Sequence, residues 1–224
     1  MADVAVIVGA GPGLGAALAR AAAADGMKVA VASRDQAKIA EVACSTGAVA
    51  IACDATDGAS VDALFDRVGR ELGVPSFVVY NASRRVRGPV AELDRAAVRQ
   101  AVDITAYGGF LVAQAAVRAM LPPGRGSLLF TGASASVKGY AESATFAMGK
   151  FALRGLAQSL ARELGPKGLH VAHVIIDGAI GRAGANEAGK LDPDAIAATY
   201  LQIHRQPRST WGHEVDLRPS VEKF

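Results

Sequence analysis

Short runs of apolar, often β-branched residues alternate with longer alanine-rich stretches along almost the whole chain. We expect strands at 4–8, 27–32, 48–53, 77–80, 127–130, 170–176 and 213–217, and helices at 14–25, 36–44, 61–72, 94–120, 144–164 and 194–203. The first strand is apolar throughout, as in a sheet that is buried on both faces. Alternation at this spacing requires parallel pairing through right-handed crossovers. The sequence therefore predicts an α/β protein, one doubly wound parallel sheet of about seven strands with helices on both faces.

Composition excludes several other classes. A chain of 224 residues fits one domain, 1–224, and 51 % hydrophobic with 20 % charged residues is too apolar for a disordered protein. The net charge of +3 is too small to indicate nucleic acid. Two cysteines make no disulfide framework, the histidines lack metal-ligand spacing, and no apolar run is long enough to span a membrane. We expect a cytoplasmic protein with no metal, no membrane and no nucleic-acid partner.

A glycine-rich turn follows the first expected strand and opens the first helix. Glycines let a backbone approach phosphate closely, and a helix N-terminus offers unpaired N–H groups and the positive end of a dipole. In this position the pattern predicts a Rossmann-type nucleotide-binding turn. Its candidate cofactor-binding residues are Gly9, Gly11, Gly13, Leu14 and Gly15.

The spacing of Gly9, Gly13 and Gly15 fits G-x-x-x-G-x-G, which resembles the short-chain dehydrogenase/reductase family. The resemblance covers nearly the whole chain and implies a nicotinamide cofactor. After the second strand an acidic residue would favour NAD, but the chain has Ser33-Arg34, and Arg can pair with a 2′-phosphate. NADP is therefore favoured over NAD. By resemblance, further cofactor contacts are expected from Asp54, Ala55, Asn81, Ala82, Lys150, Gly178 and Ile180.

The catalytic positions of the family are mostly replaced in this chain. The resemblance implies a Tyr, a Lys four residues later, a Ser thirteen residues before the Tyr, and an Asn on the preceding long helix. Only the Lys is retained, as Lys150; the Tyr, Ser and Asn positions hold Phe146, Ala133 and Thr105. Losing the proton donor alone should cost about 10²–10⁴ in rate.

Three groups are candidates to replace the missing proton donor. Tyr140 lies in the loop after the fifth strand, and Asp177 ends the sixth strand. Lys150 could itself be the acid if burial beside Phe146 lowers its pKa.

Three hypotheses about function remain open on these residues. In the first, the chain is an NADP(H)-dependent oxidoreductase with a non-standard active site and an unknown small-molecule carbonyl or alcohol substrate. In the second it is an NADP(H)-binding pseudoenzyme or sensor, and in the third it is a structural subunit. The basic run Arg84-Arg85-Val86-Arg87 is either a solvated loop or an anion site near a cofactor or acidic substrate. The resemblance also implies a homodimer or homotetramer formed through helices 94–120 and 144–164.

Overall fold

The computed structural model describes residues 2–184 and 187–221, and its centre is one seven-stranded sheet. The strands are β1 (Val4–Val8), β2 (Lys28–Ser33), β3 (Val49–Ala52), β4 (Phe77–Tyr80), β5 (Gly126–Thr131), β6 (Leu169–Ile176) and β7 (Glu214–Leu217). They lie in the order β3-β2-β1-β4-β5-β6-β7, and all pairs are parallel. The expected doubly wound sheet and its strand number are confirmed.

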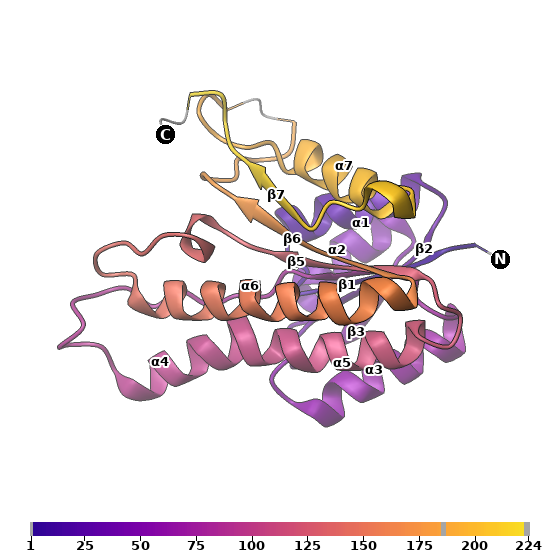
Figure 1. Cartoon of the computed structure of the whole chain (residues 1–224), viewed down its shortest axis with the longest axis horizontal. Helices are drawn as coiled ribbons and strands as arrows, with labels where there is room; N and C mark the ends of the chain where they lie inside the picture. The colour runs from indigo at the N-terminus through magenta and orange to yellow at the C-terminus, as the bar shows by residue number, and fades with distance from the viewer. Residues whose placement is uncertain (1, 185–186, 222–224) are drawn as a thin grey trace.

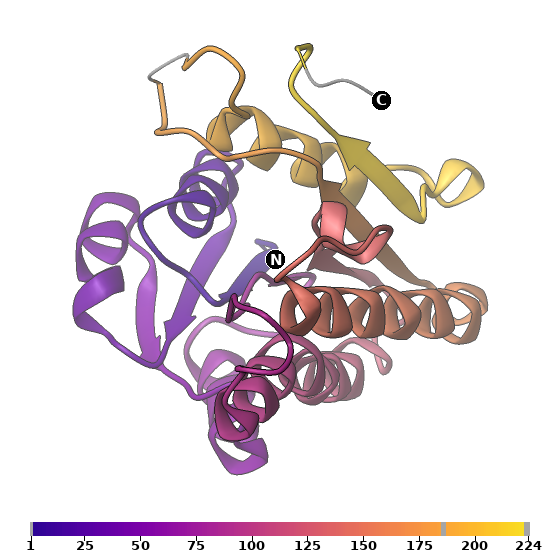
Figure 2. The same ribbon diagram turned by 90° about the vertical axis from the view of Figure 1, so that its left-hand side faces the viewer.

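Helices cover both faces of this sheet (Figure 1). They are α1 (Leu14–Ala24), α2 (Ala37–Thr46), α3 (Gly58–Glu71), α4 (Arg95–Val102), α5 (Gly108–Met120), α6 (Ala144–Leu164) and α7 (Pro193–His204). The helices α1, α2 and α7 lie on one side, and α3, α5 and α6 lie on the other, as the end-on view in Figure 2 also shows. Two apolar cores result, one on each face, and β4 contributes Phe77 to one and Tyr80 to the other.

The long helix expected at 94–120 contains a π-helical turn that the sequence did not predict. This turn, Asp103–Tyr107, joins α4 to α5. The hydroxyl of Tyr80 donates a hydrogen bond to the carbonyl of Ile104 within it. A Cβ on Gly108 would lie 2.5 Å from that hydroxyl, so glycine is required beside it. The π turn therefore forms where the helix passes a buried tyrosine of the sheet.

The carboxyl ends of the strands gather at one edge of the sheet, where its strand order reverses between β1 and β4. The two strand ends are joined by a hydrogen bond of 2.8 Å from the N–H of Asn81 to the carbonyl of Val8. In open α/β sheets such a reversal leaves a crevice in which ligands bind.

Candidate functional site

The glycine-rich turn packs tightly against the end of β4. Gly9 has φ +83°, and a Cβ there would lie 2.3 Å from the backbone nitrogen of Ala82. The side-chain amide of Asn81 donates to the carbonyl of Gly9 over 3.0 Å. A Cβ on Gly15 would lie 2.7 Å from the Cα of Ala10. Gly9 and Gly15 are therefore required by close backbone approach.

The glycine-rich turn leads directly into the start of α1. Among the residues that the structure describes, no side chain caps the helix at Gly13, and the first turn of α1 contains no acidic residue. A Cβ on Gly11 or Gly13 would meet nothing within 4 Å, so the approach is open. Because the first N–H groups of a helix lack partners within it, this end of α1 fits the phosphates of a dinucleotide.

A small cleft of about 240 Å³ lies beside the turn, at the ends of β2 and β3. Arg34 is exposed on its rim, and in the described part of the chain its guanidinium makes no hydrogen bond or ion pair. Asp54 accepts hydrogen bonds from the backbone and hydroxyl of Thr56, at 2.9 and 2.8 Å. The backbone bond and the hydroxyl bond hold the pKa of the Asp54 carboxyl below its usual range, and Arg34 adds to this. Gly9, Ser33, Ala55 and Ala82 also line this cleft.

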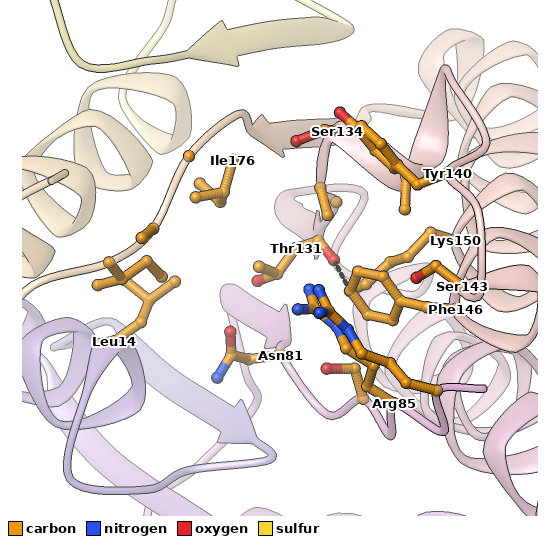
Figure 3. A pocket seen from close by; sticks show the side chains of 18 of the residues that line it. Leu14, Asn81, Arg85, Thr131, Ser134, Tyr140, Ser143, Phe146, Lys150 and Ile176 are labelled. Atoms are coloured by element: carbon orange, nitrogen blue, oxygen red, sulfur yellow. Dashed lines mark hydrogen bonds between the residues drawn. The ribbon is translucent and has the colours of Figure 1, made fainter. Parts of the chain in front are cut away.

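A larger cleft of about 700 Å³ adjoins the small one, because Asn81 and Ser83 line both. Figure 3 shows its walls, with Leu14 and Ile176 on one side and Phe146 and Lys150 on the other. Gly178 and Ile180, from the segment after β6, complete the lining. Predicted cofactor residues from the ends of five strands, β1, β2, β3, β4 and β6, are thus brought to one continuous depression.

The three replaced catalytic positions are all close to the larger cleft. Phe146 and Ala133 line it and present no hydroxyl. Thr105 is buried in the π turn, and its hydroxyl accepts a hydrogen bond of 3.2 Å from the backbone N–H of Arg84. A Cβ on Gly149 would lie 2.7 Å from the Cβ of Thr105. Thr105 therefore packs against α6 and positions the loop after β4.

Lys150 is the buried cation of the larger cleft. Its side chain rises from α6, and its Nζ donates to the carbonyl of Thr131 over 2.6 Å. The residue is 2 % exposed and lies 5.6 Å from the centre of the Phe146 ring. Burial, and next the charge of Arg85, lower the pKa of Lys150 from 10.5 to about 7. At neutral pH this amine can therefore both give and take a proton.

The other two candidate proton donors lie differently. Tyr140 lines the cleft, but its ring is half exposed, and Lys138 lies 5.8 Å from its centre. Asp177 is buried outside the lining, and its carboxylate pairs with Lys138 at 3.9 Å and Arg218 at 3.7 Å. The structure brings Tyr140 to the cleft with Lys150 and leaves Asp177 in an ion-pair network.

Sequence reasoning did not place Arg85 and Tyr80 in their observed roles. The guanidinium of Arg85 lies 4.1 Å above the Phe146 ring, inside the larger cleft (Figure 3). The only sequence signal for the role of Arg85 is the basic run 84–87, for which an anion site is one of the two interpretations given above. For Tyr80 the sequence signal is the Gly108-Gly109 pair, because a Cβ on either glycine would lie too close to the tyrosine side chain.

The two histidines of β6 contact neighbouring side chains of the fold. His170 stacks on Trp211 at 4.8 Å, and His173 is fully buried 3.3 Å from Glu214. Among residues 2–184 and 187–221 no group of three or more metal-ligating side chains lies together. Within the same residues, none of the helices combines the length and apolar character needed to cross a membrane.

The parallel sheet, the turn against α1 and the two adjoining clefts define a dinucleotide-binding protein of the doubly wound α/β class. Comparison with known proteins makes this specific: the chain belongs to the short-chain dehydrogenase family, whose model matches residues 3–188. It is thus a member of an oxidoreductase family.

Relatives of known name and structure agree with this assignment. L-2,3-butanediol dehydrogenase of Corynebacterium glutamicum is 30 % identical over 190 residues, which cover 81 % of this chain and 73 % of that protein. A short-chain dehydrogenase from Rhodopseudomonas palustris is 32 % identical with a TM-score of 0.84, over 96 % of this chain and 98 % of that one. A metagenomic short-chain oxidoreductase solved in complex with NADP is 26 % identical with a TM-score of 0.87, over 98 % of both chains.

Proposed function

We propose that the chain is an NADP(H)-dependent oxidoreductase that interconverts a carbonyl compound and its alcohol, with Lys150 as the proton donor and acceptor. The observation that carries this proposal is the buried Lys150 amine in the wall of a cleft that adjoins a nucleotide-binding turn. Relatives described as dehydrogenases and an oxidoreductase favour this catalytic hypothesis over the sensor and structural-subunit hypotheses.

Residues of the small cleft support NADP as the cofactor. The exposed guanidinium of Arg34 is available to pair with a 2′-phosphate, and Ser33 lies beside it in the same cleft. The carboxylate of Asp35, two residues after β2, accepts from the N–H of Ala37 over 3.0 Å and pairs with Lys38 at 3.7 Å, and it is not among the residues that line the small cleft. The start of α1 would hold the linking phosphates, and Asn81 lies between the two clefts.

The residues of the larger cleft would carry out the proton transfer. When bound, the cofactor supplies or accepts a hydride at its nicotinamide ring. In reduction the carbonyl carbon gains that hydride, and its oxygen takes a proton from the Nζ of Lys150, which becomes a neutral amine. The alcohol keeps this proton, and a proton from solvent restores the ammonium of Lys150; alcohol oxidation follows the same path in reverse. An acid with a pKa near the working pH is suited to both directions.

A comparison of Lys150→Met with Tyr140→Phe tests this assignment. Rates of NADPH oxidation would be measured with a panel of carbonyl compounds between about pH 5.5 and pH 9. We expect reduction by the wild-type protein to fall above about pH 7 as Lys150 loses its proton. We expect Lys150→Met to lose about 10²–10⁴ in rate, and Tyr140→Phe to lose less than about tenfold.

Fluorescence titration with NADPH would accompany each variant to separate cofactor binding from proton transfer. The reverse order of losses would assign the proton to Tyr140 and contradict the role of Lys150. Absence of saturable NADPH binding by the wild-type protein would overturn the oxidoreductase proposal itself.

We also propose that the chain forms a homodimer or homotetramer through the helices α4, α5 and α6. Four large apolar side chains are exposed on and beside these helices, with 42–54 % of their surface open: Tyr107, Phe110, Met148 and Phe151. Sedimentation of the wild-type protein and of Phe151→Glu would test this, since a charge in a helix seam should favour the monomer.

A further inference from the structure

The loop after β4 holds one arginine side chain inside the larger cleft. Two threonine hydroxyls bind its backbone on either side of Arg85. Thr105 accepts from the N–H of Arg84 at 3.2 Å, and Thr145 donates to the carbonyl of Val86 at 2.6 Å. Because these hydroxyls come from the π turn and from α6, the path of the loop is set by two packed elements. The direction of Arg85 is therefore built into the fold.

The guanidinium of Arg85 has its face covered and its N–H groups available. It stacks 4.1 Å above the ring of Phe146. Within residues 2–184 and 187–221 it makes no hydrogen bond or ion pair. Stacking on an aromatic face leaves the planar fork of N–H donors directed sideways, which is the geometry that matches a carboxylate. A phenylalanine at position 146 gives the arginine an apolar support while removing a hydroxyl.

Charge in the larger cleft is of one sign. Arg85, Arg87 and Lys150 line it, and no Asp or Glu is among its lining residues in the described part of the chain. Arg85 lies close enough to Lys150 to lower the pKa of that lysine, so the two cations repel each other. An anion bound between them would replace this repulsion with attraction.

The anion in question is distinct from the phosphates of the cofactor. Arg34 and Gly9 line the small cleft and not the larger one, whereas Arg85 lines the larger cleft and not the small one. Lys150, the proposed proton donor, lies against the same Phe146 ring as Arg85. A group held by Arg85 is therefore part of the molecule whose carbonyl faces Lys150.

We propose that the substrate is an oxo acid or the corresponding hydroxy acid, and that Arg85 binds its carboxylate. This inference rests on the proposed oxidoreductase function and names the substrate class of the same site. Arg87, which also lines the cleft, would add to the attraction without replacing the bidentate contact.

Matched acids and esters test the inference. The probes are 2-oxopentanoate and 4-oxopentanoate, each compared with its methyl ester, which keeps the carbonyl and removes the charge. The variant is Arg85→Gln, and the control is Arg84→Gln, whose side chain lines a separate hollow beside α4. Rates with NADPH would be measured for each pair, and calorimetry would measure binding of the acids to protein loaded with NADP⁺, which has no hydride to give.

We expect the wild-type protein to prefer at least one acid over its ester. Arg85→Gln should lower kcat/KM and affinity for that acid by about 10- to 100-fold, as expected for loss of a charge-assisted pair, and should change the ester by less than about threefold. Arg84→Gln should leave both within about threefold.

Equal losses for acid and ester in Arg85→Gln, or no preference for acids in the wild-type protein, would overturn the inference and leave the oxidoreductase proposal standing. If no carbonyl compound is reduced but the acids bind with Arg85-dependent affinity, the oxidoreductase proposal fails and the anion site stands. If neither binding nor reduction depends on Arg85, the anion site is refuted.

Discussion

Burial of Lys150 makes a quantitative prediction about folding stability that is independent of any substrate. In the unfolded chain the lysine keeps its proton up to about pH 10.5, whereas in the folded chain the lysine loses this proton near pH 7. Between these values the unfolded state binds more protons, so stability rises with pH by about 1.4 kcal/mol per unit. Below pH 7 the folded protein bears the full cost of the buried charge, which corresponds to about 5 kcal/mol.

Replacing Lys150 with methionine removes this titration and keeps an unbranched side chain that is one atom shorter. Free energies of unfolding would be measured by urea denaturation of the cofactor-free wild-type protein and of Lys150→Met. The wild-type value minus the variant value should rise by about 2 kcal/mol between about pH 7 and pH 9, and stay flat between about pH 5.5 and pH 6.5. His173, with a pKa lowered by burial to about 4, is neutral across this range and does not interfere.

The exposed Lys167, which pairs with Glu163 at 3.4 Å, provides a matched control. Lys167→Met removes the same charge from the molecule without removing the buried amine. A wild-type minus Lys150→Met difference that does not change between about pH 7 and pH 9 would refute the depressed pKa, and with it the argument that this amine is suited to proton transfer at neutral pH.

Three further predictions concern the cofactor and catalytic positions. Arg34→Glu should shift preference from NADPH to NADH by at least about tenfold, measured as the ratio of the two dissociation constants; an unchanged ratio would remove Arg34 from the site. Gly9→Ala should lower the free energy of unfolding by at least about 2 kcal/mol because of positive φ and backbone contact, whereas Gly11→Ala, with open space around it, should change it by less than about 1 kcal/mol in the same denaturation experiment. The double variant Phe146→Tyr, Ala133→Ser should change the reduction rate by less than about tenfold if Lys150 already supplies the proton, and a gain of about 100-fold would contradict that role.

Local patterns were sufficient to predict the sheet. The buried runs 4–8 and 77–80 are apolar at every position, which is how strands covered on both faces read, and the structure confirms both with these bounds. Asp94 caps α4, where the expected helix begins, whereas Asp57 caps α3 so that this helix begins at Gly58, three residues before its expected start at 61.

Long-range contacts explain what the sequence could not predict. The direction of Arg85 depends on the hydrogen bond between Thr145 and Val86, which are 59 residues apart, and the pKa of Lys150 depends on how deeply α6 buries it. Neither the direction of Arg85 nor the pKa of Lys150 follows from the spacing of residues in the sequence. The π turn escaped prediction for a different reason, since such turns are rare and the one residue that this turn adds is marked by no glycine or proline within Asp103–Tyr107.

That additional residue limits which changes of chain length the protein can accept. One residue of an α-helix turns its face by roughly 100°. Deleting a residue between Asp103 and Tyr107 would regularise the helix and rotate α4 against α5 by that amount, carrying Thr105 away from the loop that it holds. The length of this segment is therefore fixed by the contact between Thr105 and the loop after β4, which lines the larger cleft. In an alignment of related chains, one inserted position here would mark the chains that share this contact.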